Sequence, residues 1–310
     1  MIVKIENLVK RFDKVLAVDH LNLQIEGGEI FGLLGPNGSG KSTTINCMLS
    51  LLEYDKGTIE IFGKEMTPQS YDIKKDIGVI FQQVAVFEEL TVYENIHYFC
   101  SLYVKDRTEV KRLTEEAISF VSLEGYVKFY PKKLSGGLLR RLNIACGIAH
   151  KPKLIILDEP TVAVDPQSRN KILEGIKQLN KEGATVIYTT HYMEEAEQIC
   201  DRIAIMDRGK VLALGSKEEL KGMISIGEKI TIEVFTLKQE QLEGIKALPR
   251  VLSAEFKGNR LSIKLSKGKD NLIQILEFLT KNEIPFQQVY TEQPTLNDVF
   301  LEITGKTLRD

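Results

Sequence analysis

The sequence predicts an α/β domain built on a parallel sheet, followed by a smaller α+β domain. Short β-rich runs alternate with helical patterns over the first two-thirds of the 310 residues, as they do in α/β domains. Three runs, Ile30–Leu34, Leu154–Leu157 and Thr185–Tyr188, are almost wholly apolar, which is typical of central strands covered on both faces. In the last third the pattern changes, and we therefore expect two domains, at residues 1–223 and 224–310.

Strands of the first domain are expected wherever β-branched and apolar residues cluster between turn signals. Between Thr91 and His150 such clusters give way to helical periodicity, so a helical subdomain is expected at about residues 91–150. The expected strands are Ile2–Val9, Leu21–Ile25, Glu29–Leu34, Thr58–Phe62, Ile77–Phe81, Leu154–Leu157, Thr185–Thr189 and Arg202–Met206.

The second domain shows the order strand, helix, strand, strand, helix, strand, which indicates a small ferredoxin-like fold. Its first strand is indicated by the alternation of Ile230, Ile232 and Val234. Thr295 and Asp298 have the spacing of a capping box and predict a final helix through Phe300 and Ile303. The remaining elements are expected at Gln239–Leu248 (helix), Val251–Phe256 and Leu261–Leu265 (a hairpin), Asp270–Lys281 (helix) and Pro285–Tyr290 (strand).

Composition excludes several classes of protein. The 41 Lys and Arg nearly balance the 43 Asp and Glu, for a net charge of −2, which argues against a nucleic-acid binder that relies on overall positive charge. No segment approaches the roughly 18 consecutive apolar residues that span a bilayer, and the N-terminus lacks the pattern of a signal peptide. The cysteines are too far apart for a zinc site or a disulfide framework, so we expect reduced core residues at Cys47, Cys100, Cys146 and Cys200.

The segment Gly35–Ser42 has the complete GxxxxGKS pattern of a phosphate-binding loop. It follows an apolar strand and opens a helical pattern at Thr43, which is the structural context this motif requires. Its glycines allow backbone N–H groups to converge on phosphate oxygens, and the helix adds its positive end. We expect Lys41 to reach the β- and γ-phosphates of a nucleotide and the Ser42 hydroxyl to ligate Mg²⁺.

Two carboxylates follow the apolar strand Leu154–Leu157. Asp158 is expected to help hold Mg²⁺, and Glu159 to orient or deprotonate the attacking water. An Asp-Glu pair after a strand is by itself more often a simple helix-terminal charge. The upstream phosphate loop makes the catalytic interpretation the stronger one.

The segment Leu134–Gly137 reads Leu-Ser-Gly-Gly and precedes a basic helix through Arg140 and Arg141. These residues resemble the signature sequence of ATP-binding cassette (ABC) ATPases, and their position between the other two motifs argues against a chance match. This resemblance implies a P-loop NTPase core with antiparallel β and helical subdomains. It also implies a head-to-tail dimer, in which Ser135, Gly136 and Gly137 of one protomer face the γ-phosphate held by the other.

Other positions of the ABC family match one by one. Gln82, which directly follows Phe81, matches the Q-loop and is preferred over the adjacent Gln83; the resemblance implies contact with Mg²⁺ or water. His191 matches the switch histidine at the γ-phosphate. Phe12 lies where the family stacks an aromatic ring on adenine, the alternative being an ordinary core or edge residue. The ATP-binding set implied is Phe12, Gly35, Pro36, Asn37, Gly38, Ser39, Gly40, Lys41, Ser42, Thr43, Ser135, Gly136, Gly137 and Asp165, the last matching the D-loop.

The sequence departs from the family pattern at two places, and the first of them favours the exporter branch. The fifth signature position, usually Gln, is Leu138, and drug-exporter relatives often carry an apolar Met there. The usual Gly-Leu before the D-loop aspartate is Ala163-Val164. The tail, with Gln293–Leu301, Thr304–Lys306 and Leu308–Asp310, resembles the ending of bacterial daunorubicin- and bacitracin-resistance ATPases.

The resemblance implies the ATP-binding and ATP-hydrolysing subunit of a bacterial ABC exporter, with ATP and Mg²⁺ as ligands. It implies a homodimer, or a dimer with a paralogous ATPase subunit, docked from the cytoplasm on a separate transmembrane permease. The alternative is a soluble ABC ATPase acting on nucleic acid or ribosomes. A third class is a nucleotide-binding regulatory module without turnover, which the presence of Asp158, Glu159 and His191 disfavours.

Overall fold

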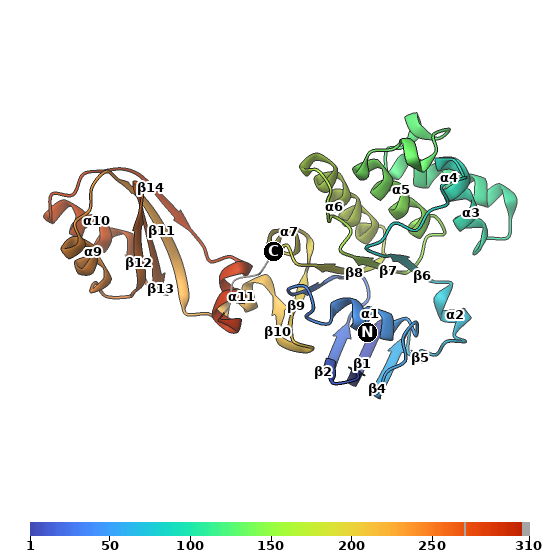
Figure 1. The fold of residues 1–310 in the computed structure, drawn as a ribbon, viewed down its shortest axis with the longest axis horizontal. Helices are drawn as coiled ribbons and strands as arrows, with labels where there is room; N and C mark the ends of the chain where they lie inside the picture. Colours follow the sequence, from blue (N-terminus) through green and yellow to red (C-terminus); the bar gives the residue numbers. More distant parts are fainter. Residues whose placement is uncertain (270, 306–310) are drawn as a thin grey trace. The chain divides into compact units, whose positions relative to one another are not determined.

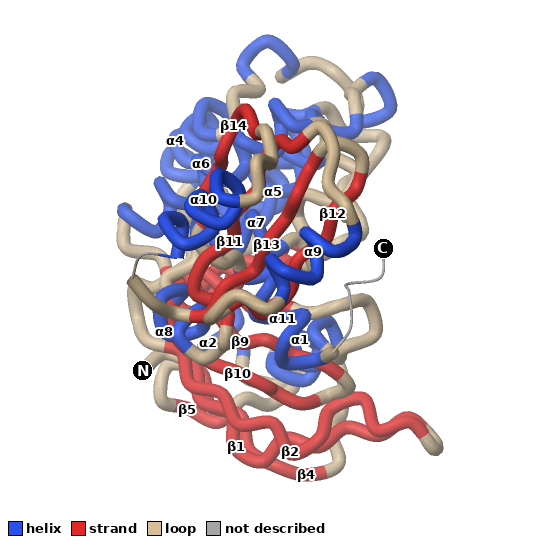
Figure 2. The backbone as a smooth tube through the Cα atoms, turned by 90° about the vertical axis from the view of Figure 1, so that its left-hand side faces the viewer, coloured by secondary structure: helices blue, strands red, loops and turns tan. Residues whose placement is uncertain are grey.

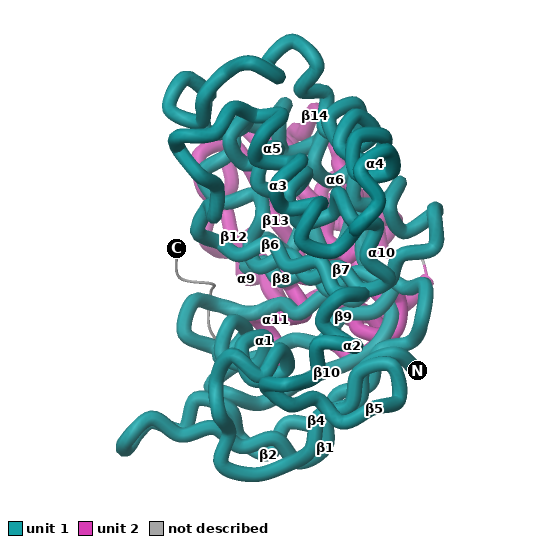
Figure 3. Tube along the Cα trace, turned by 90° about the vertical axis from the view of Figure 1, so that its right-hand side faces the viewer, with its two compact units in different colours: residues 1–216, 308–310 teal, residues 217–307 magenta. Residues whose placement is uncertain are grey.

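The computed structural model describes residues 1–269 and 271–305, which divide into two compact units (Figure 3). Unit 1 comprises Met1–Ser216, and unit 2 begins at Lys217. The predicted boundary lay later, after Met223. The difference is the short helix α8 (Lys217–Gly222), which contacts the last helix, α11 (Leu296–Thr304), and so groups with unit 2. The assignment of domains at residue 223 stays a prediction, and the tail matches at Lys306 and Leu308–Asp310 lie outside the described residues.

A six-stranded sheet with the order β10-β9-β3-β8-β7-β6 forms the centre of unit 1 (Figure 1). The strands from β9 to β6 are parallel, and β10 pairs with β9 in the antiparallel direction. The three most apolar runs of the sequence became the neighbours β3, β8 and β7, every residue of which is buried. The strands are β3 (Ile30–Leu34), β6 (Ile77–Ile80), β7 (Leu154–Asp158), β8 (Thr185–Thr190), β9 (Arg202–Asp207) and β10 (Lys210–Ser216).

A second, antiparallel sheet of unit 1 has the order β2-β1-β4-β5. The helix α1 (Lys41–Met48) lies against it (Figures 1 and 2). One core cluster joins Ile5 and Ile59 of this sheet to Ile45 of α1 and to Leu33 of the central sheet. The phosphate loop thus lies between two sheets that share a core. The strands are β1 (Val3–Phe12), β2 (Val15–Ile25), β4 (Lys56–Ile61) and β5 (Lys64–Glu65), and α2 (Tyr71–Lys74) follows.

Helices α3 (Val92–Ser101), α4 (Arg107–Phe120) and α5 (Gly136–Ile148) pack together at one end of unit 1 (Figure 1). They fill the stretch in which helical periodicity was expected. Each begins at a side-chain cap, at Thr91, Asp106 and Ser135, that accepts a hydrogen bond from a first-turn N–H. Two short 3₁₀ turns connect α4 to α5, and α6 (Pro166–Lys181) and α7 (Met193–Ile199) follow β7 and β8.

Unit 2 contains a four-stranded antiparallel sheet with the order β12-β13-β11-β14. Together with the predicted order of elements, this topology confirms the ferredoxin-like fold. Alternate residues of β11, Ile230, Ile232 and Val234, are fully buried and pack with Ile245 and Ile275 of the two helices. The elements are β11 (Ile226–Val234), α9 (Gln239–Lys246), β12 (Val251–Lys257), β13 (Arg260–Ser266), α10 (Asn271–Lys281) and β14 (Phe286–Glu292); the predicted helix start, residue 270, lies outside the described residues.

Each of the four cysteines is buried and forms no disulfide bond in the described part of the chain, as expected of reduced core residues. Strands β5 and β10 were not among the strands expected from the sequence.

In the part of the chain that the structure describes, no helix has both the length and the hydrophobicity needed to cross a bilayer.

Asp298 fixes the start of α11 in unit 2. Its buried Oδ2 accepts hydrogen bonds from the Thr295 N–H (2.9 Å), the Thr295 hydroxyl (2.8 Å) and the Lys229 amine (3.2 Å). The capping box predicted from Thr295 and Asp298 is confirmed. Burial raises the pKa of Asp298, but the bonds from Thr295 and Lys229 outweigh burial and leave the pKa below its usual range.

We expect Asp298→Ala to lower the free energy of unfolding by about 1–3 kcal/mol at pH 7, because it removes a helix cap and leaves partly buried donors of Thr295 and Lys229 without their partner. The folded-state pKa is depressed, so this stabilisation is present above the unfolded-state pKa and is lost as pH falls through the folded-state pKa. Urea unfolding of the full chain at pH 7 and at a series of pH values below the ordinary pKa of Asp, with the exposed Glu277→Ala as control, measures both effects. Equal losses for the two variants would contradict the prediction.

Candidate functional site

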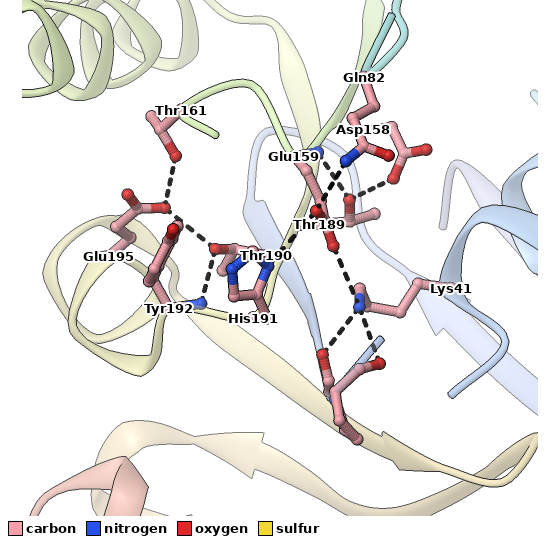
Figure 4. A network of polar contacts seen from close by, with 12 residues as sticks. Lys41, Gln82, Asp158, Glu159, Thr161, Thr189, Thr190, His191, Tyr192 and Glu195 are labelled. Atoms are coloured by element: carbon pink, nitrogen blue, oxygen red, sulfur yellow. Dashed lines mark hydrogen bonds and ion pairs between the residues drawn. The ribbon is translucent and has the colours of Figure 1, made fainter. Parts of the chain in front are cut away.

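The site lies where the parallel strands of the central sheet end. In the register of the sheet, Leu34 at the end of β3 pairs with Thr190, and Asp158 at the end of β7 pairs with Thr189. The carboxyl ends of parallel strands meet at one edge of a sheet, which is where open α/β folds bind ligands. The phosphate loop, the two carboxylates and the segment around His191 therefore emerge side by side (Figure 4).

The phosphate loop has a backbone that only glycine fits at two positions. Gly40 has φ 106°, and a Cβ there would lie 2.5 Å from the Ala17 carbonyl oxygen of β2. A Cβ on Gly35 would lie 2.3 Å from the Met206 carbonyl oxygen. Within the loop the Ser39 hydroxyl is buried without a hydrogen-bond partner. A tight glycine cradle with an unpartnered donor, directly before a helix N-terminus, suits the phosphates of a nucleotide.

Lys41, the first residue of α1, places its amine at the centre of the site. The side chain is buried, and its Nζ donates to the carbonyl oxygens of Gly35 (2.8 Å) and Pro36 (3.2 Å). It also forms an ion pair with Glu159, at 3.3 Å from Oε1. Burial lowers the pKa of Lys41, while the carboxylates of Glu159 and Asp158 oppose that shift.

The Glu159 carboxylate contacts three other predicted site residues (Figure 4). Oε1 faces Lys41, and Oε2 accepts a hydrogen bond from Gln82 Nε2 (3.4 Å) and lies 3.3 Å from His191 Nδ1. Glu159 is 6% exposed. The structure thus brings Lys41, Gln82, Glu159 and His191, which come from four separate segments of the chain, to one carboxylate.

Asp158 offers oxygen ligands of the kind that Mg²⁺ prefers. Its Oδ1 accepts a hydrogen bond from the Thr189 hydroxyl (2.6 Å), and the same hydroxyl accepts from the Glu159 N–H (3.0 Å). Ser42 is exposed in the first turn of α1, and Gln82 uses its amide nitrogen toward Glu159, which leaves its amide oxygen for other partners. Carboxylate, hydroxyl and amide oxygens make Asp158, Ser42 and Gln82 a donor set that fits the ion.

A second buried carboxylate, that of Glu195 in α7, binds residues adjacent to the site. Its Oε2 accepts hydrogen bonds from the hydroxyls of Tyr188 (2.7 Å), Thr161 (2.9 Å) and Thr190 (3.0 Å). Burial raises the pKa of Tyr188 well above its usual range, and the nearby Glu195 adds to the shift. Glu195 thereby ties the segment after Glu159 to the strand end that carries His191.

Other predicted residues lie outside this network of described side chains. Phe12, at the end of β1, is 46% exposed, with the Lys10 amine 5.0 Å from its ring centroid. Ser135 caps α5, and Asp165 caps α6 by accepting from the Ser168 N–H at 2.9 Å. A Cβ on Gly137 would lie 2.5 Å from the Ser168 hydroxyl, so the starts of α5 and α6 pack closely.

Sequence reasoning missed Thr189 and Glu195, and with Glu195 its partners Thr161, Tyr188 and Thr190. The available signal was the pair of hydroxyls that ends the apolar strand Thr185–Thr190. Buried hydroxyls need partners, so their position beside the Asp-Glu pair indicates a polar network. No spacing rule identifies Glu195 as its centre.

Two family models match the chain. The model described as "ABC transporter" matches residues 18–162, and the model described as "ATP-binding protein DrrA1-3-like, C-terminal domain" matches residues 215–304. The first match spans the phosphate loop, the signature sequence and both carboxylates. The second covers most of unit 2.

Two curated proteins and one solved structure are similar over most of their lengths. The linearmycin resistance ATP-binding protein LnrL of Bacillus subtilis (strain 168) is 38% identical over 98% of this chain and 99% of its own length. The daunorubicin/doxorubicin resistance ATP-binding protein DrrA of Streptomyces peucetius is 34% identical, over 99% and 94%. A dimeric ATP-binding cassette solved in a post-hydrolysis state with ADP and Pi aligns with a TM-score of 0.63 at 30% identity, over 69% of this chain and 98% of that one.

We expect Thr189→Val to weaken Mg²⁺-dependent ATP binding by about 10-fold to 100-fold, because it removes the hydroxyl that orients Asp158 while keeping the shape of the side chain. A titration of Mg²⁺ against a fluorescent ATP analogue measures the effect. The control is Thr185→Val at the opposite end of β8, where the hydroxyl accepts from the Gly28 N–H at 2.9 Å. The same Mg²⁺ dependence in both variants would argue against the role of Thr189.

Proposed function

The chain belongs to the ATP-binding proteins of the ABC transporter family and is an ATPase, and on that premise we propose that it powers a bacterial exporter as a head-to-tail dimer docked on a separate transmembrane permease. The observation that carries the catalytic part of the proposal is the convergence of Lys41, Gln82 and His191 on the Glu159 carboxylate. A nucleotide phosphate, a charge-neutralising amine and a general base would meet at this point.

In the proposed reaction, Lys41 exchanges its bonds to the loop carbonyls for bonds to the β- and γ-phosphates. Glu159 accepts a proton from a water molecule as the water oxygen bonds to the γ-phosphorus. The bond from that phosphorus to the bridging oxygen breaks, and its electron pair stays on ADP. His191 and Gln82 hold the carboxylate and the water in position.

Asp158, Ser42 and Gln82 would hold Mg²⁺, which when bound neutralises phosphate charge. The nucleotide itself would be bound by the loop from Gly35 to Thr43. Phe12 would supply an aromatic face for the adenine, since its ring is half-exposed at the end of β1.

The starts of α5 and α6 support the dimer part of the proposal. Ser135 and Gly136 are exposed, and a Cβ on Gly136 would meet nothing closer than a carbonyl oxygen at 3.9 Å. Backbone N–H groups at such a helix start can bind an anion. Because the network around Glu159 does not include them, we propose that Ser135, Gly136 and Gly137 contact the γ-phosphate of the partner protomer, with Asp165 beside them.

The segment that follows Gln82 supports docking on a membrane partner. The ring of Phe87 lies 5.1 Å from Tyr98 and 5.8 Å from Phe99 (centroid distances), and Phe87 and Tyr98 are 43% and 41% exposed. The Phe87 N–H is bonded to Asn95 and the Ala85 N–H to Asn143, so α3 and α5 hold the segment. Phe87 follows Gln82, which contacts Glu159, by five positions along the chain, and this exposed aromatic cluster is where we place the permease, on the cytoplasmic side of the membrane.

The transported molecule is proposed from the relatives alone. Two of the relatives bear resistance names, for linearmycin and for daunorubicin and doxorubicin. Efflux of a drug or antibiotic is therefore the substrate class we propose, and the apolar Leu138 in the signature agrees with it.

We expect Glu159→Gln to keep ATP binding and to lower kcat by about 10²-fold to 10⁴-fold, the usual contribution of a general base. ATP should then accumulate a stable dimer, measured by size-exclusion chromatography with light scattering. Glu194→Gln, at an exposed position in the first turn of α7, serves as control. Hydrolysis at the wild-type rate by Glu159→Gln would exclude the general-base role.

We expect Phe87→Asp to abolish co-purification of the chain with a polytopic membrane protein from native membranes, while ATP binding is retained. The control is Tyr71→Asp on α2, a side chain that is 75% exposed and lies outside the aromatic cluster. Mass spectrometry of both preparations identifies the partner. Recovery of ribosomal or DNA-associated partners, with nothing embedded in a membrane, would favour a soluble ATPase instead.

A further inference from the structure

The backbone of Glu159 lies in the left-handed region, with φ 48°. For a residue other than glycine this conformation is unfavourable, and it persists only when its surroundings hold it. The Glu159 N–H donates to Thr189, at 3.2 Å from the carbonyl oxygen and 3.0 Å from the hydroxyl. The carbonyl oxygen of the same residue, Glu159, accepts a hydrogen bond from Arg140 Nη2 at 3.3 Å.

Arg140 joins the helix of the signature sequence to two catalytic segments. It lies in α5, which Ser135 caps, and its side chain is buried, at 5% exposed. While Nη2 donates to Glu159, Nη1 donates to the Phe81 carbonyl oxygen at 3.0 Å, directly before Gln82. A planar guanidinium with donors in fixed directions can hold two carbonyl groups at once, which an amine does less well.

We propose that Arg140 is a positioning residue that sets the backbone of Glu159 and Phe81 relative to the signature helix, and so aims the Glu159 carboxylate at the attacking water. The inference rests on the proposed role of Glu159 as general base. Because Arg140 and the γ-phosphate-binding end of α5 are on one helix, a displacement of that end by nucleotide would act on the base directly. Arg140 itself touches neither substrate nor reacting atoms.

The chain provides a matched control in the adjacent residue. Arg141 is on the same helix and also bonds two carbonyl groups, those of Val121 (2.8 Å) and Ser122 (3.2 Å), with the same nitrogen. Its partners lie at the end of α4 and not at the catalytic segments. A substitution at Arg141 therefore removes similar bonds to a helix of unit 1 without altering the support of Glu159.

The test compares Arg140→Gln with Arg141→Gln in steady-state ATP hydrolysis and in binding of a fluorescent ATP analogue. We expect Arg140→Gln to lower kcat by about 10-fold to 100-fold, the effect of misplacing a catalytic group, with KM and ATP affinity within about threefold of wild type. Arg140→Lys, which keeps the charge but supports one carbonyl at a time, should be intermediate and is used if Arg140→Gln does not fold. A kcat for either variant within about twofold of Arg141→Gln would overturn the proposal.

A double-variant cycle separates positioning from general damage. In a Glu159→Gln background there is no base to aim, so adding Arg140→Gln should leave the residual rate unchanged. A further fall in rate, or a loss of ATP affinity, would indicate a structural role and overturn the inference. Normal hydrolysis by Glu159→Gln alone would instead refute the proposed function, which distinguishes the two failures.

Discussion

The buried ion pair between Lys41 and Glu159 is the interaction on which the site depends. Removing two charges from water is costly, and a buried pair seldom stabilises a fold unless other bonds satisfy it. Here the loop carbonyls of Gly35 and Pro36 satisfy the amine, and Gln82 and His191 contact the carboxylate. The parallel register of β3, β7 and β8 brings these groups together, so the central sheet is built to hold a charged pair at its edge.

The surrounding polar groups hold the backbone and the strand ends around this pair in place. Thr189 and Arg140 bond the N–H and the C=O of Glu159, and Glu195 ties the neighbouring segments together. In a buried site of low dielectric these hydrogen bonds hold their partners more strongly than they would in water. The direction of one carboxylate therefore depends on residues from α5, α7 and β8.

The sequence predicted what periodicity and motif spacing can encode. Continuous apolar runs identified β3, β7 and β8, and the alternation of Ile230, Ile232 and Val234 identified β11, because these patterns follow from burial. The short, polar Lys64–Glu65 lacks such a pattern and is a strand because a neighbour pairs with it. In Lys210–Ser216 the apolar run Val211–Leu214 ends at Gly215, and the segment forms a strand by pairing with β9. Arg140 was seen only as part of a basic helix, since a side chain that bonds distant carbonyls has no spacing signature.

The central claim is that each catalytic site joins the phosphate loop of one protomer to the signature helix start of the other. Mixing Lys41→Ala with Gly136→Asp tests it, since Asp at the open Gly136 position places a carboxylate beside the expected phosphate without a clash. Each variant alone should be inactive. In a head-to-tail dimer the mixed pair regains one intact site, and ATP hydrolysis should return to about a quarter of the wild-type rate after equal mixing. A mixture as inactive as either variant would contradict the shared site.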